Sequence, residues 1–173
     1  MKDRTRVITT ERLRLRPLTE ADADWWVGLH ADEEVNRFVG GYTPEQAAAR
    51  LRAIQDQWER RGHGLCAVEL RGTGEVIGRS GLNWWERFDE TEIGWTFARA
   101  HWGRGYATEA AEAVLAWGFG TLRLQRITAM IHHGNTASTA VASRLGFARL
   151  REDTVLDRPC TVFALDREDF ASR

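Results

Sequence analysis

The segment HWGRGYATEA, residues 101–110, places two glycines, an arginine and a threonine between an expected strand and an expected helix. Gly103 and Gly105 let the backbone turn tightly without a clash from a β-carbon. The first amides of the following helix have no partners inside it and carry the positive end of its dipole. Such a turn suits an anion, best a phosphate or pyrophosphate, with Arg104 and Thr108 as added donors. A helix start without any ligand is the alternative interpretation.

Two familiar phosphate-binding patterns do not match this turn. A dinucleotide-binding fingerprint needs a third glycine and an acid about 20 residues further on, at the end of the next strand. The third glycine is missing, and the region of Gln125 and Arg126 offers no acid. A P-loop needs a Gly-Lys-Ser/Thr triplet, which the sequence lacks. Neither pattern therefore explains the turn.

The elements that must position this turn follow from residue patterns. Leucine and arginine alternate over residues 11–18, which is typical of a strand with one exposed face. Capping signals predict helices over 19–30 and 43–62. The further predicted elements are a hairpin of strands 65–70 and 75–82, strand 91–97, helix 107–118, strand 126–131, helix 135–146, and strands 147–152 and 160–165. The order β-α-α-β-β-β-α-β-α-β-β predicts a mixed α/β sheet flanked by about four helices, in a single domain over 1–173.

Composition and charge limit the functions that this chain can have. It has 173 residues, 43% of them hydrophobic and 28% charged, which is typical of a folded globular protein. The formal net charge of −1 provides no overall attraction to nucleic acid or to an anionic membrane. The first residues are charged throughout, so we expect neither a signal peptide nor a membrane span. Cys66 and Cys160 lack metal-ligand spacing, which favours reduced thiols in a cytoplasmic protein without a bound metal.

Four blocks, in this order and at this spacing, resemble the GNAT acetyltransferase superfamily. The blocks are TTERLRLRPLTEADAD, EIGWTF, HWGRGYATEA and NTASTAVASRLGF, and they extend over nearly the whole chain. The third block is similar to the RimL-like branch, which acetylates protein N-termini and small amines. The resemblance implies a twisted, mostly antiparallel sheet and transfer of an acetyl group from acetyl-CoA, without a metal. The acceptor would be a primary amine on a small molecule or a protein N-terminus.

The resemblance also implies where acetyl-CoA binds. The superfamily's loop Gln/Arg-x-x-Gly-x-Gly/Ala falls on Trp102, Gly105 and Ala107, so Trp102 departs from the general pattern. Backbone amides hold the pyrophosphate, so this change of side chain should matter little. The backbone of the predicted strand 91–97 would pair with the pantetheine arm of acetyl-CoA. Asn135 would hydrogen-bond the same arm. The expected cofactor-binding residues are Trp95, Thr96, Phe97, Gly105, Tyr106, Ala107, Thr108 and Asn135. Arg99, Arg104 and Arg144 are either contacts for the adenine end or plain solvated charges.

Acetyl transfer from a thioester needs a base that takes a proton from the amine. It also needs a hydrogen-bond donor or acid for the departing thiolate. No Ser-His-Asp or Cys-His pair is evident, so we expect direct attack in a ternary complex. Glu92 is the first choice of base, as in similar enzymes, and Asp157 is its rival. The tyrosine that many GNAT enzymes use as an acid is replaced by Ala142, and the RimL-like branch places Ser138 near the leaving sulfur. Glu92 could also be an ordinary surface residue of a strand, and Ser138 an ordinary helix residue. His133 is a weaker candidate base.

Tryptophan pairs point to the acceptor pocket. Neighbours in a helix or strand point in different directions, so one of each pair cannot share its partner's core. In similar folds the first two helices and the loop after the third strand frame the acceptor site. The resemblance therefore implies Trp26, Trp84 and Trp85 as pocket walls, with core packing or a partner interface as the alternative. Acids that could hold a cationic amine are Glu33, Glu34, Glu86 and Asp89.

Other interpretations of the whole chain stay open from the sequence. The missing tyrosine leaves room for a GNAT-like domain that binds acyl-CoA as a sensor or scaffold without turnover. An unrelated phosphate-binding α/β protein survives only if the four-block resemblance is coincidence. Exposed tryptophans fit a homodimer surface as well as a pocket.

Overall fold

The computed structural model describes residues 6–173, which form one mixed sheet with helices on both faces. The strands are β1 (Ile8–Thr9), β2 (Leu13–Pro17), β3 (Leu65–Leu70), β4 (Val76–Trp85), β5 (Glu90–Phe97), β6 (Arg126–His132), β7 (Ala148–Val155) and β8 (Arg158–Asp166). The helices are α1 (Ala23–Ala31), α2 (Glu33–Val39), α3 (Pro44–Arg61), α4 (Tyr106–Gly120), α5 (Thr136–Arg144) and α6 (Arg167–Ala171).

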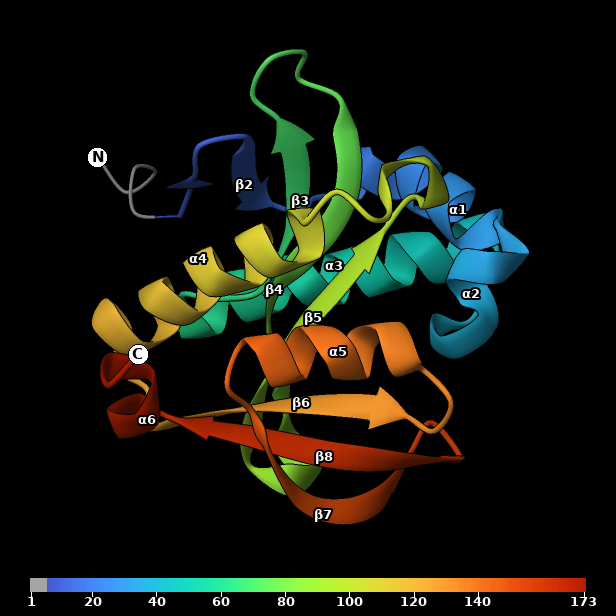
Figure 1. The fold of residues 1–173 in the computed structure, drawn as a ribbon. Helices are drawn as coiled ribbons and strands as arrows, with labels where there is room; N and C mark the ends of the chain where they lie inside the picture. The colour runs from blue at the N-terminus through green and yellow to red at the C-terminus, as the bar shows by residue number, and fades with distance from the viewer. Residues whose placement is uncertain (1–5) are drawn as a thin grey trace.

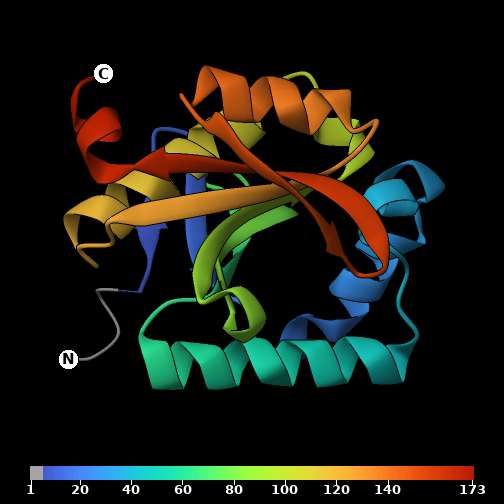
Figure 2. The same cartoon turned by 90° about the horizontal axis from the view of Figure 1, so that it is seen from below.

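The sheet has the strand order β1-β2-β3-β4-β5-β6-β8-β7. All neighbouring strands are antiparallel except β5 and β6, which are parallel. Helix α3 covers one face, and α4 and α5 lie on the other (Figures 1 and 2). The prediction of a mixed, mostly antiparallel α/β sheet is confirmed. Within residues 6–173, no helix is both long and apolar enough to cross a membrane.

Helix α3 shows how local signals place an element beside the site. The Thr43 hydroxyl accepts a hydrogen bond from the Gln46 amide at 3.2 Å, and the Gln46 side chain accepts one from the Thr43 amide at 3.0 Å. These two bonds satisfy amides that a helix start leaves free. At the other end Gly62 has a φ of 73°, which glycine adopts without strain. The buried face of α3 includes Trp58, whose indole donates to the Leu65 carbonyl at 2.9 Å.

Three short elements, β1, α2 and α6, were not predicted. The chain leaves the helical conformation at Asp32 (φ −71°, ψ 119°), and the Asp32 side chain then accepts from the Glu34 amide at 3.0 Å. A second N-cap therefore starts α2 directly after α1. The predicted helix 19–30 begins as a 3-10 turn over Glu20–Asp22. Strand β4 is also longer than predicted, because it includes Trp84 and Trp85, which we expected after the strand.

Candidate active site

Strands β5 and β6 part soon after they meet. Their register contains one pair, Glu92 with Thr128, although β5 continues to Phe97 and β6 to His132. Beyond Glu92, the described strands pair with β5 only on its β4 side. The other edge of β5 therefore offers backbone donors and acceptors to an extended ligand, and Glu92 lies where this gap opens.

A cavity of about 1050 Å³ surrounds this gap. Helices α1 to α3, strands β4 to β6, the start of α5 and the β7–β8 turn all contribute to its wall. The predicted residues that line it are Trp26, Trp84, Trp85, Glu92, Trp95, Thr96, Asn135 and Ser138. Its volume is at the upper end of single-ligand pockets, which reach about 1,000 Å³, so it has room for parts of two reactants.

Glu92 is held by one hydrogen bond at the cavity wall. The Trp85 indole donates to its Oε1 at 3.1 Å. Burial raises the pKa of Glu92 to about 7. Hydrogen bonding from Trp85 and the nearby charges of Arg79 and Arg50 lower this pKa, so desolvation outweighs them. A carboxyl with this pKa can accept a proton near neutral pH.

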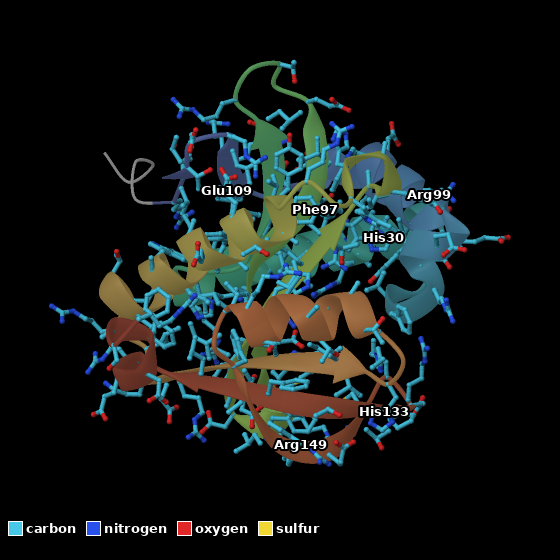
Figure 3. The ribbon with its side chains drawn as sticks, viewed as in Figure 1. His30, Phe97, Arg99, Glu109, His133 and Arg149 are labelled. Carbon is cyan, nitrogen blue, oxygen red and sulfur yellow. The ribbon has the colours of Figure 1, made fainter. Side chains whose placement is uncertain are left out.

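Arg79 is a site residue that the sequence analysis missed. Its Nη2 lies 3.4 Å from His30 Nε2, and its guanidinium lies 4.8 Å from the centre of the Trp26 ring. His30 is fully buried on α1, and burial lowers its pKa to about 4. Figure 3 shows His30 inside the molecule, between α1 and the sheet. An arginine in the middle of a strand with buried neighbours was the available signal.

A second arginine, Arg50 on α3, also lines the cavity. It donates to the Asn83 side-chain oxygen at 3.2 Å, and Asn83 is the register partner of Glu92. Arg61, from the end of α3, stacks at 3.8 Å on the Trp84 ring. Of the acids expected to hold a cationic amine, only Glu86 lines the cavity. The cavity wall is therefore richer in arginine than we predicted.

Ser138 and Asn135 lie at the start of α5. The Asn135 side-chain oxygen accepts a hydrogen bond from the Ser138 amide at 3.2 Å, so Asn135 caps this helix. The Trp95 indole donates to the Ser138 hydroxyl oxygen at 3.2 Å. A hydroxyl that accepts in this way keeps its own hydrogen free to donate elsewhere. Trp95 thus orients Ser138, which makes the serine a donor at the cavity wall.

The glycine turn is built as the sequence indicated. Gly103 and Gly105 have φ values of 72° and 80°, and Gly105 starts α4 without a side-chain cap. The Trp102 indole donates to the Phe97 carbonyl at 2.7 Å and so ties the turn to the end of β5. Arg144 of α5 donates to the Thr108 hydroxyl at 3.2 Å. The free amides of the first turn of α4 therefore have a cation beside them.

Arg12 is a second cation at this turn that the sequence analysis missed. Its Nη2 lies 3.5 Å from the position that a β-carbon on Gly105 would take. It forms an ion pair with Glu109 at 2.6 Å and lies 4.4 Å from the centre of the Tyr106 ring. Its place on β2, far from the turn in sequence, left no local signal for this contact.

Other predicted residues lie away from the cavity. Asp157 is exposed in the two-residue turn between β7 and β8 and does not line the cavity, unlike its neighbour Leu156. Arg99 pairs with Asp32 at 3.2 Å. In Figure 3, Arg99 and Glu109 lie on opposite sides of Phe97. The Phe97 side chain is buried in the core, so only its backbone can reach a ligand.

His133 and Arg104 also differ from what a site role would need. His133 forms a 2.6 Å contact with Glu152 at the surface, and Figure 3 shows it beside β8. Arg104 is exposed, and its carbonyl oxygen accepts a hydrogen bond from Arg12 at 3.0 Å. The structure thus brings Glu92, Asn135 and Ser138 together and leaves His133 and Asp157 outside.

Comparisons with known proteins agree with this architecture. The family model described as "Acetyltransferase (GNAT) domain" matches residues 12–148. The uncharacterized protein YkkB of Bacillus subtilis is 33% identical over 168 residues, which cover 94% of this chain and 96% of YkkB. The uncharacterized N-acetyltransferase p20 of Bacillus licheniformis is 33% identical over 145 residues, 81% of each chain.

A solved structure is also similar over most of its length. It is described as "Putative GnaT-family acetyltransferase from Bordetella pertussis", with 31% identity and a TM-score of 0.81. The match covers 91% of this chain and 98% of the Bordetella chain. The sequence matches and the shared fold lead to one conclusion: this chain belongs to the GNAT acetyltransferase family.

Proposed function

We propose that this protein is an acetyl-CoA-dependent N-acetyltransferase of the RimL-like type, which moves an acetyl group to a primary amine. The observation that carries the proposal is the position of Glu92. It is a carboxyl with a raised pKa, in a cavity of about 1050 Å³, at the point where β5 and β6 part. Family membership supports acetyl transfer, and the Trp-Gly-x-Gly-Tyr-Ala turn at 102–107 supports the RimL-like assignment.

Acetyl-CoA fits the groups around the gap as the donor. The free edge of β5 at Trp95 and Thr96 suits the amide groups of a pantetheine arm. The uncapped start of α4, with Arg144 and Arg12 beside it, suits a pyrophosphate. Acetyl-CoA supplies an activated acyl group as a thioester, and the residues of this chain would bind and orient it.

In this proposal Glu92 takes a proton from the acceptor amine. An α-amino group has a pKa of about 7.7–8.0 and an unperturbed glutamate one of about 4.3. Transfer from such an amine to an ordinary glutamate would cost about 5 kcal/mol, at about 1.4 kcal/mol for each pKa unit. The raised pKa of Glu92 reduces this cost to about 1 kcal/mol. Burial of the carboxyl is thus what makes it a useful base.

Ser138 would stabilise the departing thiolate. The Trp95 indole occupies a lone pair of the Ser138 hydroxyl, which leaves the hydroxyl hydrogen to donate. A serine is a weak acid, so a hydrogen bond to sulfur is the whole role we assign to it. The amine attacks the thioester directly in a ternary complex, and no covalent enzyme intermediate is needed.

Release of free thiol from acetyl-CoA tests the proposed function. The purified protein is mixed with acetyl-CoA and a panel of polyamines, aminoglycosides, amino acids and short peptides. We expect release above the hydrolysis background with one class of acceptor. Acetyl-CoA that raises the melting temperature without any transfer would favour the alternative, a binding domain without turnover. No rise and no release would contradict the proposal.

A further inference from the structure

Two arginines in the cavity have no carboxylate partner. Arg79 on β4 and Arg50 on α3 both line it. Within residues 6–173, no carboxylate oxygen lies within 4.0 Å of either guanidinium. A buried cation is costly unless an opposite charge or good hydrogen bonds compensate it. The Glu92 carboxylate is near enough for both charges to lower its pKa, but it forms an ion pair with neither arginine. The pair can therefore bind an anion that comes from outside the chain.

Arg79 is rigidly placed yet has donors to spare. His30 Nδ1 lies 2.9 Å from the Trp26 carbonyl oxygen and donates to it, so His30 Nε2 is an acceptor for Arg79 Nη2 at 3.4 Å. The Nε of Arg79 is buried and has no hydrogen-bond partner in the described chain. Burial lowers the pKa of Arg79 to about 10, so the side chain stays charged at neutral pH.

The separation of Arg79 and Glu92 limits the size of a molecule that could bind to both side chains. Arg79 Nη1 lies 4.0 Å from the position that a β-carbon on Gly94 would take. Gly94 is two residues from Glu92 on the same face of β5, which corresponds to about 6.7 Å along a strand. One small molecule can therefore direct an amine to Glu92 and an anionic group to Arg79.

We propose that the acceptor is an amine that also carries a carboxylate, of the amino-acid type, and that Arg79, with Arg50 beside it, binds this carboxylate. The inference rests on the proposed function, because it names the substrate class of the same site. A guanidinium presents two parallel N–H donors that match a carboxylate. A polyamine, or a peptide whose N-terminal residue has no acidic side chain, lacks an anionic group at this distance.

Matched pairs of amino acids and their α-carboxamides test the inference with the wild-type protein. The members of a pair share the side chain and the amine and differ in the negative charge. With rates referred to the deprotonated amine, we expect kcat/KM for the acid to exceed that for the amide by about 10- to 100-fold, the worth of a charged hydrogen bond.

Variants of Arg79 assign this preference to one side chain. In Arg79→Gln we expect the preference to disappear, mainly through a higher KM for the acid, while the KM for acetyl-CoA stays unchanged. Arg79→Lys keeps the charge without the paired donors and should lose part of the preference. Arg52→Gln is the control, because Arg52 is exposed on α3 and lies outside the cavity wall. Should Arg79→Gln fail to fold, Arg79→Lys and Arg50→Gln take its place.

The outcomes separate this inference from the proposed function. Amides or polyamines that react as well as the acids in wild-type protein would overturn the inference and leave the transferase standing. An acid preference that survives in both Arg79→Lys and Arg50→Gln would also overturn it. No thiol release with any acid, amide, polyamine, aminoglycoside or short peptide would overturn the proposed function, and the inference with it.

Discussion

Replacement of Glu92 by glutamine should slow transfer strongly and stabilise the fold at the same time. The glutamine keeps a side-chain oxygen that can accept the Trp85 hydrogen bond. It removes the carboxylate, which is the proposed base. In wild-type protein, kcat/KM should fall about tenfold per pH unit below about pH 7, where Glu92 becomes protonated. With rates referred to the deprotonated amine, this dependence should vanish in Glu92→Gln, at a rate about 10²–10⁴-fold lower.

The stability change follows from the raised pKa of Glu92. The folded value is about 7 and the reference value is 4.5, so the unfolded chain loses its proton first as the pH rises. The free energy of unfolding therefore decreases as the pH rises from 4.5 to about 7, and it stays at the lower value above that range. Relative to wild type, Glu92→Gln should gain about 2–3 kcal/mol between pH 5 and pH 8, or about 5–10 °C in melting temperature.

Thermal melts and thiol-release kinetics at pH 5 and pH 8 measure both effects. Glu59→Gln is the control, because Glu59 is an exposed residue of α3 outside the cavity wall. It should leave kcat/KM unchanged. The reasoning is refuted if Glu92→Gln keeps wild-type activity at pH 8. It is refuted equally if its stability relative to wild type is the same at both pH values, because Glu92 would then not titrate as its burial requires.

Three further changes give expected outcomes. Ser138→Ala should lower kcat about 10- to 100-fold with little change in the KM for acetyl-CoA, because a hydrogen bond to a charged thiolate is lost; equal kinetics would remove Ser138 from the mechanism. Gly105→Ala, at a φ of 80°, should lower the free energy of unfolding by about 1 kcal/mol or more and weaken acetyl-CoA binding. Gly120→Ala at the end of α4 should stabilise the fold instead. Melting temperatures and KM values for acetyl-CoA check both variants. His30→Phe removes a histidine whose pKa is about 4 in the folded protein and 6.5 in the unfolded chain. As the pH falls from 6.5 to 4, the free energy of unfolding of wild type should fall by about 3 kcal/mol relative to this variant. Urea unfolding measures the difference.

Elements with strong local signals were predicted well. The capping box at Thr43, the glycine that ends α3 and the left-handed glycines before α4 all act within a few residues, and the structure contains each of them. Shorter elements were missed because their signals compete with neighbours. The N-cap at Asp32 lies just after the predicted helix 19–30, and it starts α2, which no predicted helix covers.

The proposed site was predicted unevenly. Glu92, Asn135 and Ser138 follow from the family resemblance, and all three line the cavity. Asp157, the rival base, lies in a tight two-residue turn whose two residues both have positive φ. The turn directs Leu156 to the cavity, and Asp157 does not line it.

The sequence by itself determined the order of the longer strands and helices, the glycine turn and the family, because these depend on neighbours within a few residues or on blocks in a fixed order. Only the tertiary structure decided where β5 leaves β6, how deeply Glu92 is buried and which groups surround Arg79. His30 and Arg79 are 49 residues apart, and Arg50 and Asn83 are 33 apart. Desolvation and charge pairing act through space, so the pKa of Glu92 and the cationic wall beside it arise from contacts that no local pattern encodes.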